Sequence, residues 1–306
     1  MARDSFYQQS KLMLECLPYV FQTNLFALKG GTAINFFIRN MPRLSVDIDL
    51  TYLPINERTT ALGEIESELK EISKRVKSSL PNSKVAEPKD SNGMIHKLLV
   101  SQNGVEIKIE TNPVIRSAVH EVEYREPAEK VQDEFEMSFE IPTLSFEDLY
   151  GGKICAALDR QHPRDLFDIK YLFDHEGITE KIRKTFIAYL ISHKRPLHEV
   201  LKPNEIDISR PYQNEFSGMV NENVSLETLL EVRKRLISEI NSDLTSNERL
   251  FLIGFQNTTP DWSLLDLNIK NLPSVRWKLL NLEKLKANNP KRHTELGNSL
   301  REKLNL

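Results

Sequence analysis

The run at positions 44–53, in which apolar and polar residues alternate strictly as far as Tyr52, places the strongest constraint on the fold of this chain. Such alternation is typical of a β-strand with one face buried and one face exposed. The apolar face consists of Leu44, Val46, Ile48, Leu50 and Tyr52. The polar face carries two carboxylates, Asp47 and Asp49. The chain must therefore build a sheet that buries the first face and holds both aspartates together on the second.

Other alternating segments lie before residue 111, whereas helical periodicity dominates after residue 145. Runs at 96–101 and 105–111 flank Asn103-Gly104, and Asn-Gly between two such runs predicts a β-hairpin. Helices are expected at 4–21, 64–80, 146–158, 164–173, 181–193, 226–244 and 279–306. We therefore predict an α+β protein with a mixed sheet and flanking helices in residues 1–145 and a helical domain in residues 146–306.

Composition and length narrow the class of protein. The 306 residues are 40% apolar and 28% charged, as in globular proteins, and the length favours two domains. No run approaches the ~20 apolar residues of a membrane span, and residues 1–14 do not resemble a signal peptide. Two cysteines, Cys16 and Cys155, cannot form a disulfide framework or a four-thiolate zinc site, so we expect buried thiols and a cytoplasmic protein without membrane partners.

The net charge of −3 hides an uneven distribution. Residues 271–306 carry eight lysines and arginines against three acids, whereas residues 111–150 carry three basic residues against ten acids. The basic end could approach a polyanion, and the acidic middle would repel one or meet a basic partner. Both segments could equally be ordinary solvated faces.

The sharpest chemical feature is Gly30-Gly31-Thr32 followed by Asp47 and Asp49. A Gly-Gly turn that opens a helix directs backbone N–H groups at an anion. Two carboxylates on one strand face can bind a hard cation at one point, and their mutual repulsion favours such a cation. A further acidic strand at 105–111 could supply a third carboxylate for two-metal chemistry. An exposed polar strand face is the alternative.

A second block contains Lys153 in an apolar helix, followed by Arg164, Asp165 and Asp168 on the next helix. The lysine is either directed at a ligand or a surface residue that extends its ammonium to solvent. The two aspartates share a helical face, as a structural ion-pair network would also require. The seven histidines lack zinc-site spacing, and neither a serine-hydrolase elbow nor a P-loop occurs.

The run KGGTAINFFIRNMPRLSVDIDLTYL resembles the nucleotidyltransferase signature of the DNA polymerase β superfamily. It is more closely similar to the AbiEii/AbiGii toxin family, the nucleotidyltransferase-like toxins of toxin–antitoxin and phage-abortive systems. Residues 153–160 and 164–168 resemble that family's later motif, a lysine on one helix and R-D-x-x-D on the next. The resemblance covers about residues 1–175, and residues 176–306 fit the helical extension of such toxins.

The resemblance implies a role for each matching residue. Three residues would hold the triphosphate, Gly30, Gly31 and Thr32, the last standing where many relatives have Ser. The carboxylates of Asp47 and Asp49 would bind Mg²⁺, with Mn²⁺ as an alternative, and Glu110 would be the third metal ligand, with Glu106 as the runner-up. Lys153 would contact the nucleotide phosphates, and Asp165 would orient Lys153 or the attacking hydroxyl.

The implied function is that of a toxin in a toxin–antitoxin system. It would be a metal-dependent nucleotidyltransferase that transfers NMP from an NTP to an acceptor hydroxyl, most readily the 3′ end of tRNA, and so blocks translation. A cognate antitoxin would be its partner. Two alternatives stay open: a nucleotidyltransferase that modifies a protein or a small molecule, and a nucleotide-binding module without turnover.

Overall fold

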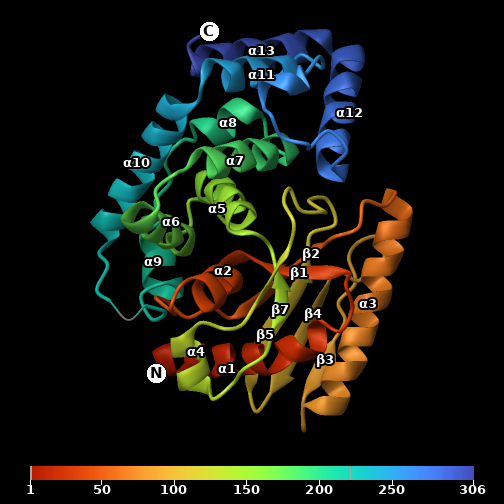
Figure 1. The fold of residues 1–306 in the computed structure, drawn as a ribbon, viewed down its shortest axis with the longest axis vertical. Helices are drawn as coiled ribbons and strands as arrows, with labels where there is room; N and C mark the ends of the chain where they lie inside the picture. The colour runs from red at the N-terminus through yellow and green to blue at the C-terminus, as the bar shows by residue number, and fades with distance from the viewer. Residues whose placement is uncertain (1, 221) are drawn as a thin grey trace. The chain divides into compact units, whose positions relative to one another are not determined.

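Two compact units make up the chain in the computed structural model, which describes residues 2–220 and 222–306 (Figure 1). Unit 1 is Met1–Leu149 with Gln213–Val224, and unit 2 is Tyr150–Tyr212 with Ser225–Leu306. The segment 213–224 lies beyond the expected boundary at residue 145, yet it contacts unit 1. The backbone N–H of Leu44 donates to the Met219 carbonyl at 2.8 Å.

Seven strands of unit 1 form one mixed sheet within residues 2–220. The strands are β1 Phe26–Lys29, β2 Asp47–Tyr52, β3 Lys84–Ala86, β4 Lys97–Gln102, β5 Val105–Thr111, β6 Glu123–Arg125 and β7 Ile141–Thr143. Their order across the sheet is β3-β4-β5-β2-β1-β7-β6. Strand β2 pairs parallel with β5 and antiparallel with β1, and β1 pairs parallel with β7. The predicted α+β class with a mixed sheet is confirmed.

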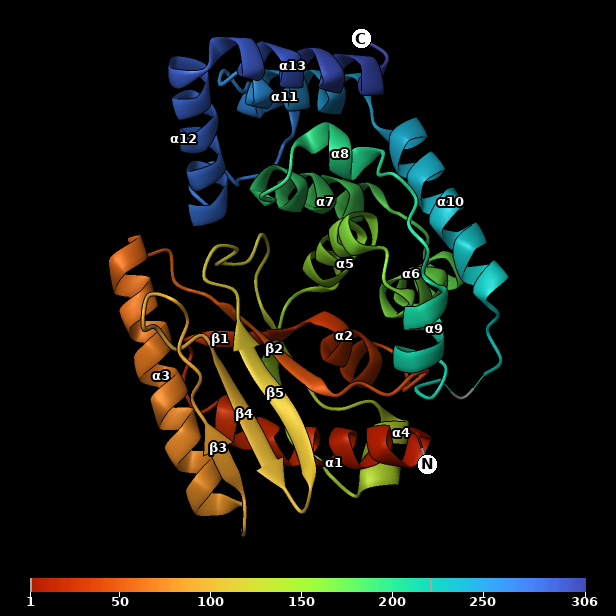
Figure 2. The same ribbon diagram turned by 180° about the vertical axis from the view of Figure 1, so that it is seen from behind.

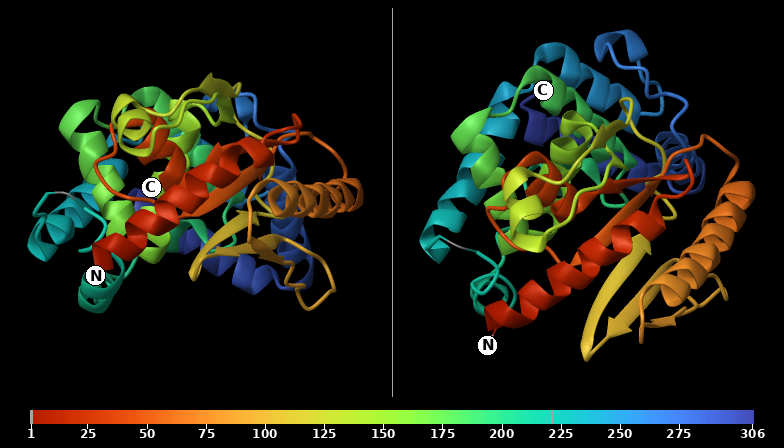
Figure 3. Two further views of the ribbon diagram at one scale, coloured as in Figure 1. Left: turned by 90° about the horizontal axis from the view of Figure 1, so that it is seen from below. Right: turned by 60° about the horizontal axis from the view of Figure 1, so that its bottom comes forward.

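The helices of unit 1 are α1 Ala2–Val20, α2 Gly30–Ala33, the π-helix η1 Ile34–Ile38, α3 Arg58–Ser79 and α4 Glu129–Phe135. Helix α1 contacts β5, β2 and α3, and α3 contacts β3 and β4 (Figure 2 and Figure 3). Ile48, Leu50 and Ile109 of the central strands are fully buried, as are Leu14 and Leu17 of α1. Removal of these apolar side chains from water stabilises the sheet and holds its strands in register.

Several predicted elements are confirmed, and the differences have local causes. The hairpin turn has Asn103 at φ 51° and Gly104 at φ 82°, as a type I′ turn requires. Strand β2 begins at Asp47 rather than residue 44, because Leu44 bonds to Met219 instead of a sheet neighbour. The strands β1, β3, β6 and β7 and helix α4 were not predicted, since elements of three to seven residues show too little periodicity.

Unit 2 is helical in its described residues. Its elements are α5 Phe146–Arg160, α6 Pro163–His175, α7 Glu180–Ser192, α8 Leu197–Leu201, α9 Ser209–Glu215, α10 Leu226–Asp243, α11 Ser246–Gln256, the 3₁₀ helix η2 Trp262–Leu264, α12 Pro273–Asn288 and α13 Pro290–Leu304. The first turn of α5 and the end of α9 belong to unit 1. Helices α12 and α13 meet at Asn289, whose side chain accepts the Arg292 N–H at 3.0 Å. Helices α8, α9 and α11 were not predicted.

Two compositional expectations can be compared with the structure. Cys16 and Cys155 are both buried free thiols, and burial raises the pKa of each to about 12. Both cysteines are therefore packed as small apolar side chains, as expected. Over residues 2–220 and 222–306, no helix has the length and apolar character that crossing a membrane requires.

Candidate functional site

The parallel pairing of β2 with β5 brings three predicted site residues onto one face of the sheet in unit 1. Asp49 is the register partner of Glu110, and Asp47 is the partner of Lys108. Register partners on neighbouring strands point to the same face and lie about 4.8 Å apart. The carboxylates of Asp47, Asp49 and Glu110 therefore share a surface, which we call the carboxylate face.

Lys108 places a positive charge within the carboxylate face. Its Nζ lies 3.1 Å from Glu110 Oε1, and its side chain is 33% exposed. Burial lowers the pKa of Lys108, but the charges of Asp47, Glu110 and Asp49 outweigh that effect, so the pKa is raised. The Lys108 ammonium thus stays charged and partly compensates the three carboxylates. Lys108 alternates with Glu106 and Glu110 along the sequence of β5, but no role was assigned to it from the sequence.

The carboxylate face has the chemistry of a magnesium site. In the described part of the chain, no group of three or more His, Cys, Asp or Glu side chains is gathered as a metal site. Mg²⁺, however, is usually bound through one or two carboxylates together with substrate phosphates and water, rather than by an all-protein cage. Asp47 and Asp49 supply two hard oxygen ligands of this kind on one strand. The donor set therefore fits Mg²⁺ bound together with a phosphate ligand.

The Gly30-Gly31 turn leaves room for Asp49. Gly30 has φ +74°, and a Cβ added to it would lie 2.4 Å from Asp49 Oδ2. A Cβ added to Gly31 would lie 2.5 Å from Arg43 Nη2. Gly30 is required by its backbone conformation, and side-chain ends approach both glycines closely. The turn therefore brings main chain directly against the Asp49 carboxylate.

Thr32, predicted to hold the triphosphate, is 1% exposed and directed into unit 1. Its hydroxyl donates to the Asp47 carbonyl oxygen at 2.6 Å and lies 2.9 Å from Ser45 Oγ. These contacts join the start of α2 to the start of β2 and so position Asp47. The structure thus gives the Thr32 hydroxyl a protein partner.

Arg43 is a residue near the site that sequence reasoning did not select. Its side chain is 2% exposed and packs against Gly31, and Nη1 donates to the Leu44 carbonyl at 2.9 Å. A buried guanidinium at this position adds positive charge beside the turn. Arginine is rarely buried, and the sequence shows only a basic residue after Pro42, so no local pattern indicated this placement.

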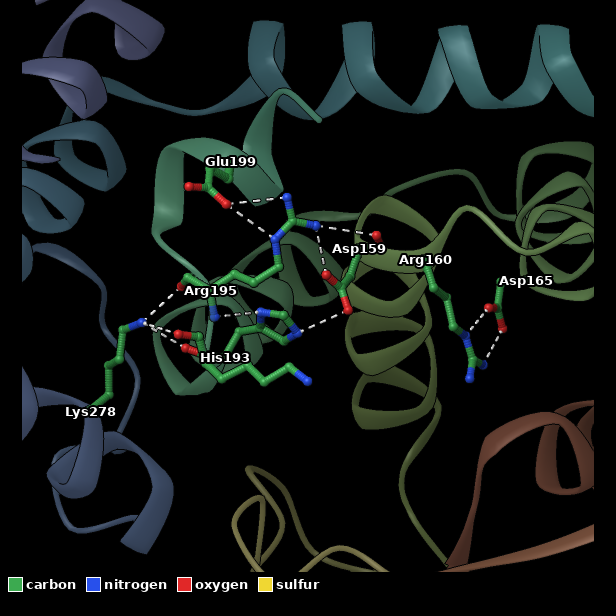
Figure 4. Close-up of polar contacts among 8 residues, drawn as sticks. Asp159, Arg160, Asp165, His193, Arg195, Glu199 and Lys278 are labelled. Carbon is green, nitrogen blue, oxygen red and sulfur yellow. Dashed lines mark hydrogen bonds and ion pairs between the residues drawn. The ribbon is translucent and has the colours of Figure 1, made fainter. Parts of the chain in front are cut away.

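The second predicted cluster lies in unit 2, between α5 and α6. Lys153 is buried, and its Nζ lies 2.8 Å from Asp165 Oδ1 and 2.9 Å from Asp168 Oδ2. Arg160 donates to Asp165 through Nε at 2.5 Å and Nη2 at 2.9 Å, as Figure 4 shows. The alternative that Lys153 extends its ammonium to solvent is therefore wrong, since its side chain is 5% exposed and paired with two aspartates.

The charge of Asp165 depends on these two cations. Burial alone raises the pKa of a carboxyl group, but the Lys153 ammonium and the Arg160 guanidinium hold the pKa of Asp165 well below its usual range. Asp165 is therefore ionised at neutral pH and fixes the position of Lys153. Arg160, whose side chain is 60% exposed, extends this cluster to the surface of unit 2.

Comparisons with known proteins show the family of this chain and a similar fold. A family model described as "Nucleotidyl transferase AbiEii toxin, Type IV TA system" matches residues 11–281. The solved structure of MenT4, a nucleotidyltransferase toxin from Mycobacterium tuberculosis H37Rv, is similar in fold, with a TM-score of 0.59 and 16% sequence identity over 91% of each chain. No curated protein matches the sequence.

Gly30→Ala tests the close approach of the turn to Asp49. We expect the variant to lower the free energy of unfolding by about 1–3 kcal/mol, because a positive φ and a displaced carboxylate both oppose the new methyl group. Gly63→Ala is the matched control, since Gly63 lies inside α3 with nothing within 4 Å of its added Cβ. Urea unfolding measures both variants, and equal stability of the two would contradict the prediction.

Asp165→Asn tests the buried cluster through pH. At pH 7 we expect the variant to lose about 3 kcal/mol of unfolding free energy, because Lys153 loses a charged partner inside the protein. The lowered pKa of Asp165 stabilises the fold above the unfolded value of about 4, and this contribution disappears as the pH falls below it. The deficit of the variant should therefore shrink between pH 5 and pH 2.

The control for this variant is Asp174→Asn on the same helix. Asp174 pairs with Lys170 at 2.6 Å, but the Asp174 side chain is about half exposed, so we expect a change below about 0.5 kcal/mol. Unfolding free energies across the pH range decide the matter. A pH-independent deficit for Asp165→Asn would show that the cluster contributes packing rather than charge.

Proposed function

Because the chain belongs to the AbiEii family of nucleotidyltransferase toxins of type IV toxin–antitoxin systems, as its motifs predicted, we propose that it transfers a nucleoside monophosphate from an NTP to the 3′ hydroxyl of a tRNA. The observation that carries this proposal is the placement of Asp47 and Asp49 on one face of β2, with Asp49 directly against the Gly30 turn. That arrangement supplies two metal ligands beside a main-chain approach to a phosphate.

The residues of unit 1 have complementary roles in this proposal. Gly30 and Gly31 receive the triphosphate, and Asp47 and Asp49 hold Mg²⁺, or Mn²⁺ in its place. When bound, the metal stabilises charge on the transferred phosphate and lowers the pKa of the attacking hydroxyl. Glu110 serves as the third carboxylate because it is the register partner of Asp49. Thr32 supports the site from inside through its bond to Asp47.

Glu106 is a weaker candidate for the third carboxylate. It pairs in register with Ser101 of β4 and lies four residues before Glu110 on β5. At about 3.3 Å per residue, this spacing separates the two positions by about 13 Å along the strand. A single metal site beside Asp49 therefore favours Glu110.

The cluster in unit 2 supplies a fixed positive charge. We assign Lys153 to the nucleotide phosphates and Asp165 to the orientation of Lys153. Arg160 supports this assignment, since its two bonds to Asp165 hold that carboxylate in place while Lys153 approaches a ligand. Lys153 retains Asp168 as a second partner throughout.

The partners follow from the same proposal. Toxins of such systems act with a cognate antitoxin, and an NTP is the substrate of a nucleotidyltransferase. We assign tRNA as the acceptor and the cytoplasm as the location, where tRNA and NTPs meet. Two buried free thiols agree with a reducing compartment.

The basic segment 271–306 is our candidate for the tRNA contact. Its member Lys278 is used internally, because Nζ donates to the carbonyl oxygens of His193 and Arg195 at 2.8 Å each (Figure 4). Burial lowers the pKa of Lys278 to about 8. Lys291 and Arg292, in contrast, are exposed at the start of α13. These two residues are therefore the better placed to meet phosphates.

Incubation with total tRNA, Mg²⁺ and each α-labelled NTP in turn tests the proposed reaction. We expect one or more NTPs to label tRNA, and Asp47→Asn to reduce labelling at least 100-fold, because a neutral amide replaces a charged metal ligand. Asp133→Asn, at an exposed position of α4, is the control and should keep full activity. Circular dichroism is the check that both variants fold.

Other outcomes of the same assay point to different functions. Label in protein or in a small molecule would replace tRNA as the acceptor. Tight binding of Mg·NTP without release of pyrophosphate would indicate a nucleotide-binding module. Full activity of Asp47→Asn would remove the aspartate pair from the mechanism.

Reversal of both charges in Lys291→Glu with Arg292→Glu tests the tRNA contact. We expect weaker tRNA binding and a salt dependence flatter by about one unit of slope for each tRNA phosphate that the variant no longer neutralises. The exposed pair of Arg292 with Glu295 at 3.2 Å contributes little to stability, so the fold should tolerate the change. Lys70→Glu with Lys74→Glu on α3, which breaks two similar exposed pairs, is the control. Equal salt slopes for both double variants would place the tRNA site elsewhere.

A further inference from the structure

Four charged residues form one row across the carboxylate face. Lys97 of β4 is the register partner of Glu110 on β5, Glu110 is the partner of Asp49 on β2, and Asp49 is the partner of Lys29 on β1. Partners share a face, so the row reads lysine, carboxylate, carboxylate, lysine. The two carboxylates in the middle repel each other, and this repulsion requires a nearby cation.

Lys108 is the cation that the fold places closest to that pair. It lies one row away, opposite Asp47, and its Nζ approaches Glu110 Oε1 to 3.1 Å. It also interacts electrostatically with Asp47 and Asp49. The side chain is one-third exposed, so the ammonium can exchange Glu110 for a partner that arrives from solvent.

The formal charges within these two rows cancel in the absence of a ligand. Asp47, Asp49 and Glu110 contribute three negative charges, and the three lysines of the two rows, Lys29, Lys97 and Lys108, contribute three positive charges. A divalent cation that approaches the protein alone meets no net attraction and competes with Lys108 for Glu110. A bound triphosphate adds negative charge and offers the ammonium a strong alternative partner.

We propose that Lys108 is a positioning residue, the built-in counter-ion of Asp47, Asp49 and Glu110. Because of this counter-ion, the divalent cation binds the carboxylate face together with the triphosphate of the nucleotide and not before it. In the nucleotide complex, the Lys108 ammonium moves from Glu110 to a phosphate oxygen and leaves the Glu110 carboxylate to the metal. This inference rests on the nucleotide site of the proposed function.

Electron paramagnetic resonance of Mn²⁺ tests the order of binding without any turnover. Protein is titrated with Mn²⁺ alone and with Mn²⁺ plus an α,β-methylene NTP analogue, and the analogue without protein is subtracted. We expect the wild-type protein to bind Mn²⁺ at least tenfold more tightly when the analogue is present. This comparison needs no variant, and equal affinity in both titrations would overturn the inference.

Lys108→Met tests the residue itself, since methionine keeps the unbranched stem without the charge. We expect Mn²⁺ binding in the absence of analogue to tighten about tenfold, equal to about 1.4 kcal/mol. Lys97→Met is the matched control, because it removes a lysine from the other side of Glu110, at an exposed position. Its effect should stay below about threefold. A tenfold effect in both variants would mean that net charge alone sets metal affinity and would overturn the role of Lys108.

Two further measurements keep the inference separate from the proposed function. Lys108→Gln repeats the test if Lys108→Met fails to fold, and Lys108→Arg, which keeps the charge, should bind Mn²⁺ as the wild-type protein does. Failure of every protein to bind Mn²⁺ with the analogue would overturn the nucleotide site itself. Tight Mn²⁺ binding by the wild-type protein in both titrations would overturn only the role of Lys108.

Discussion

The parallel pairing of β2 with β5 is the constraint on which the rest of the site depends. It buries Ile48, Leu50 and Ile109 on one face, and the same register sets Asp49 beside Glu110 on the other. A slip of one residue would move every side chain of a strand to the opposite face, exposing the core and separating the carboxylates. Hydrophobic burial therefore holds together charges that would otherwise repel. The stability of the sheet and the chemistry of its polar face have one origin.

The two charged clusters balance their charges in different ways. In unit 2, Lys153 and Asp165 are enclosed, and the network offsets the loss of hydration only while all its members are present. Such a network holds its geometry but contributes little net stability, which favours a functional reason for its presence. On the carboxylate face, Lys108 and Glu110 remain partly exposed and their pair can exchange partners. The enclosed cluster fixes a charge, and the open one can respond to a ligand.

Sequence patterns were sufficient for the features that a single segment encodes. Alternation predicted the central strands, Asn103-Gly104 predicted the hairpin, and two short motifs together indicated the family. The short strands β1 and β7 were not predicted, because three or four residues are too few to show an alternation of apolar and polar residues. The roles of Lys108 and Arg43 were not predicted for a different reason. Each depends on which residue of another segment lies against it, Asp47 for Lys108 and Gly31 for Arg43, and the local sequence pattern does not specify such contacts.

Thr32 illustrates why a motif residue need not touch the ligand that the motif serves. Its hydroxyl is turned inward to the Asp47 carbonyl, at 2.6 Å, and its side chain is closed to solvent. Serine at this position would offer the same hydroxyl and would lack only the methyl group. A preference for either residue follows from the bond that joins the turn to β2, since both carry a hydroxyl that can donate to the Asp47 carbonyl. The motif therefore specifies the construction of the site as much as its contacts. Gly30 makes space for Asp49, and the Thr32 hydroxyl holds the start of β2 at Asp47.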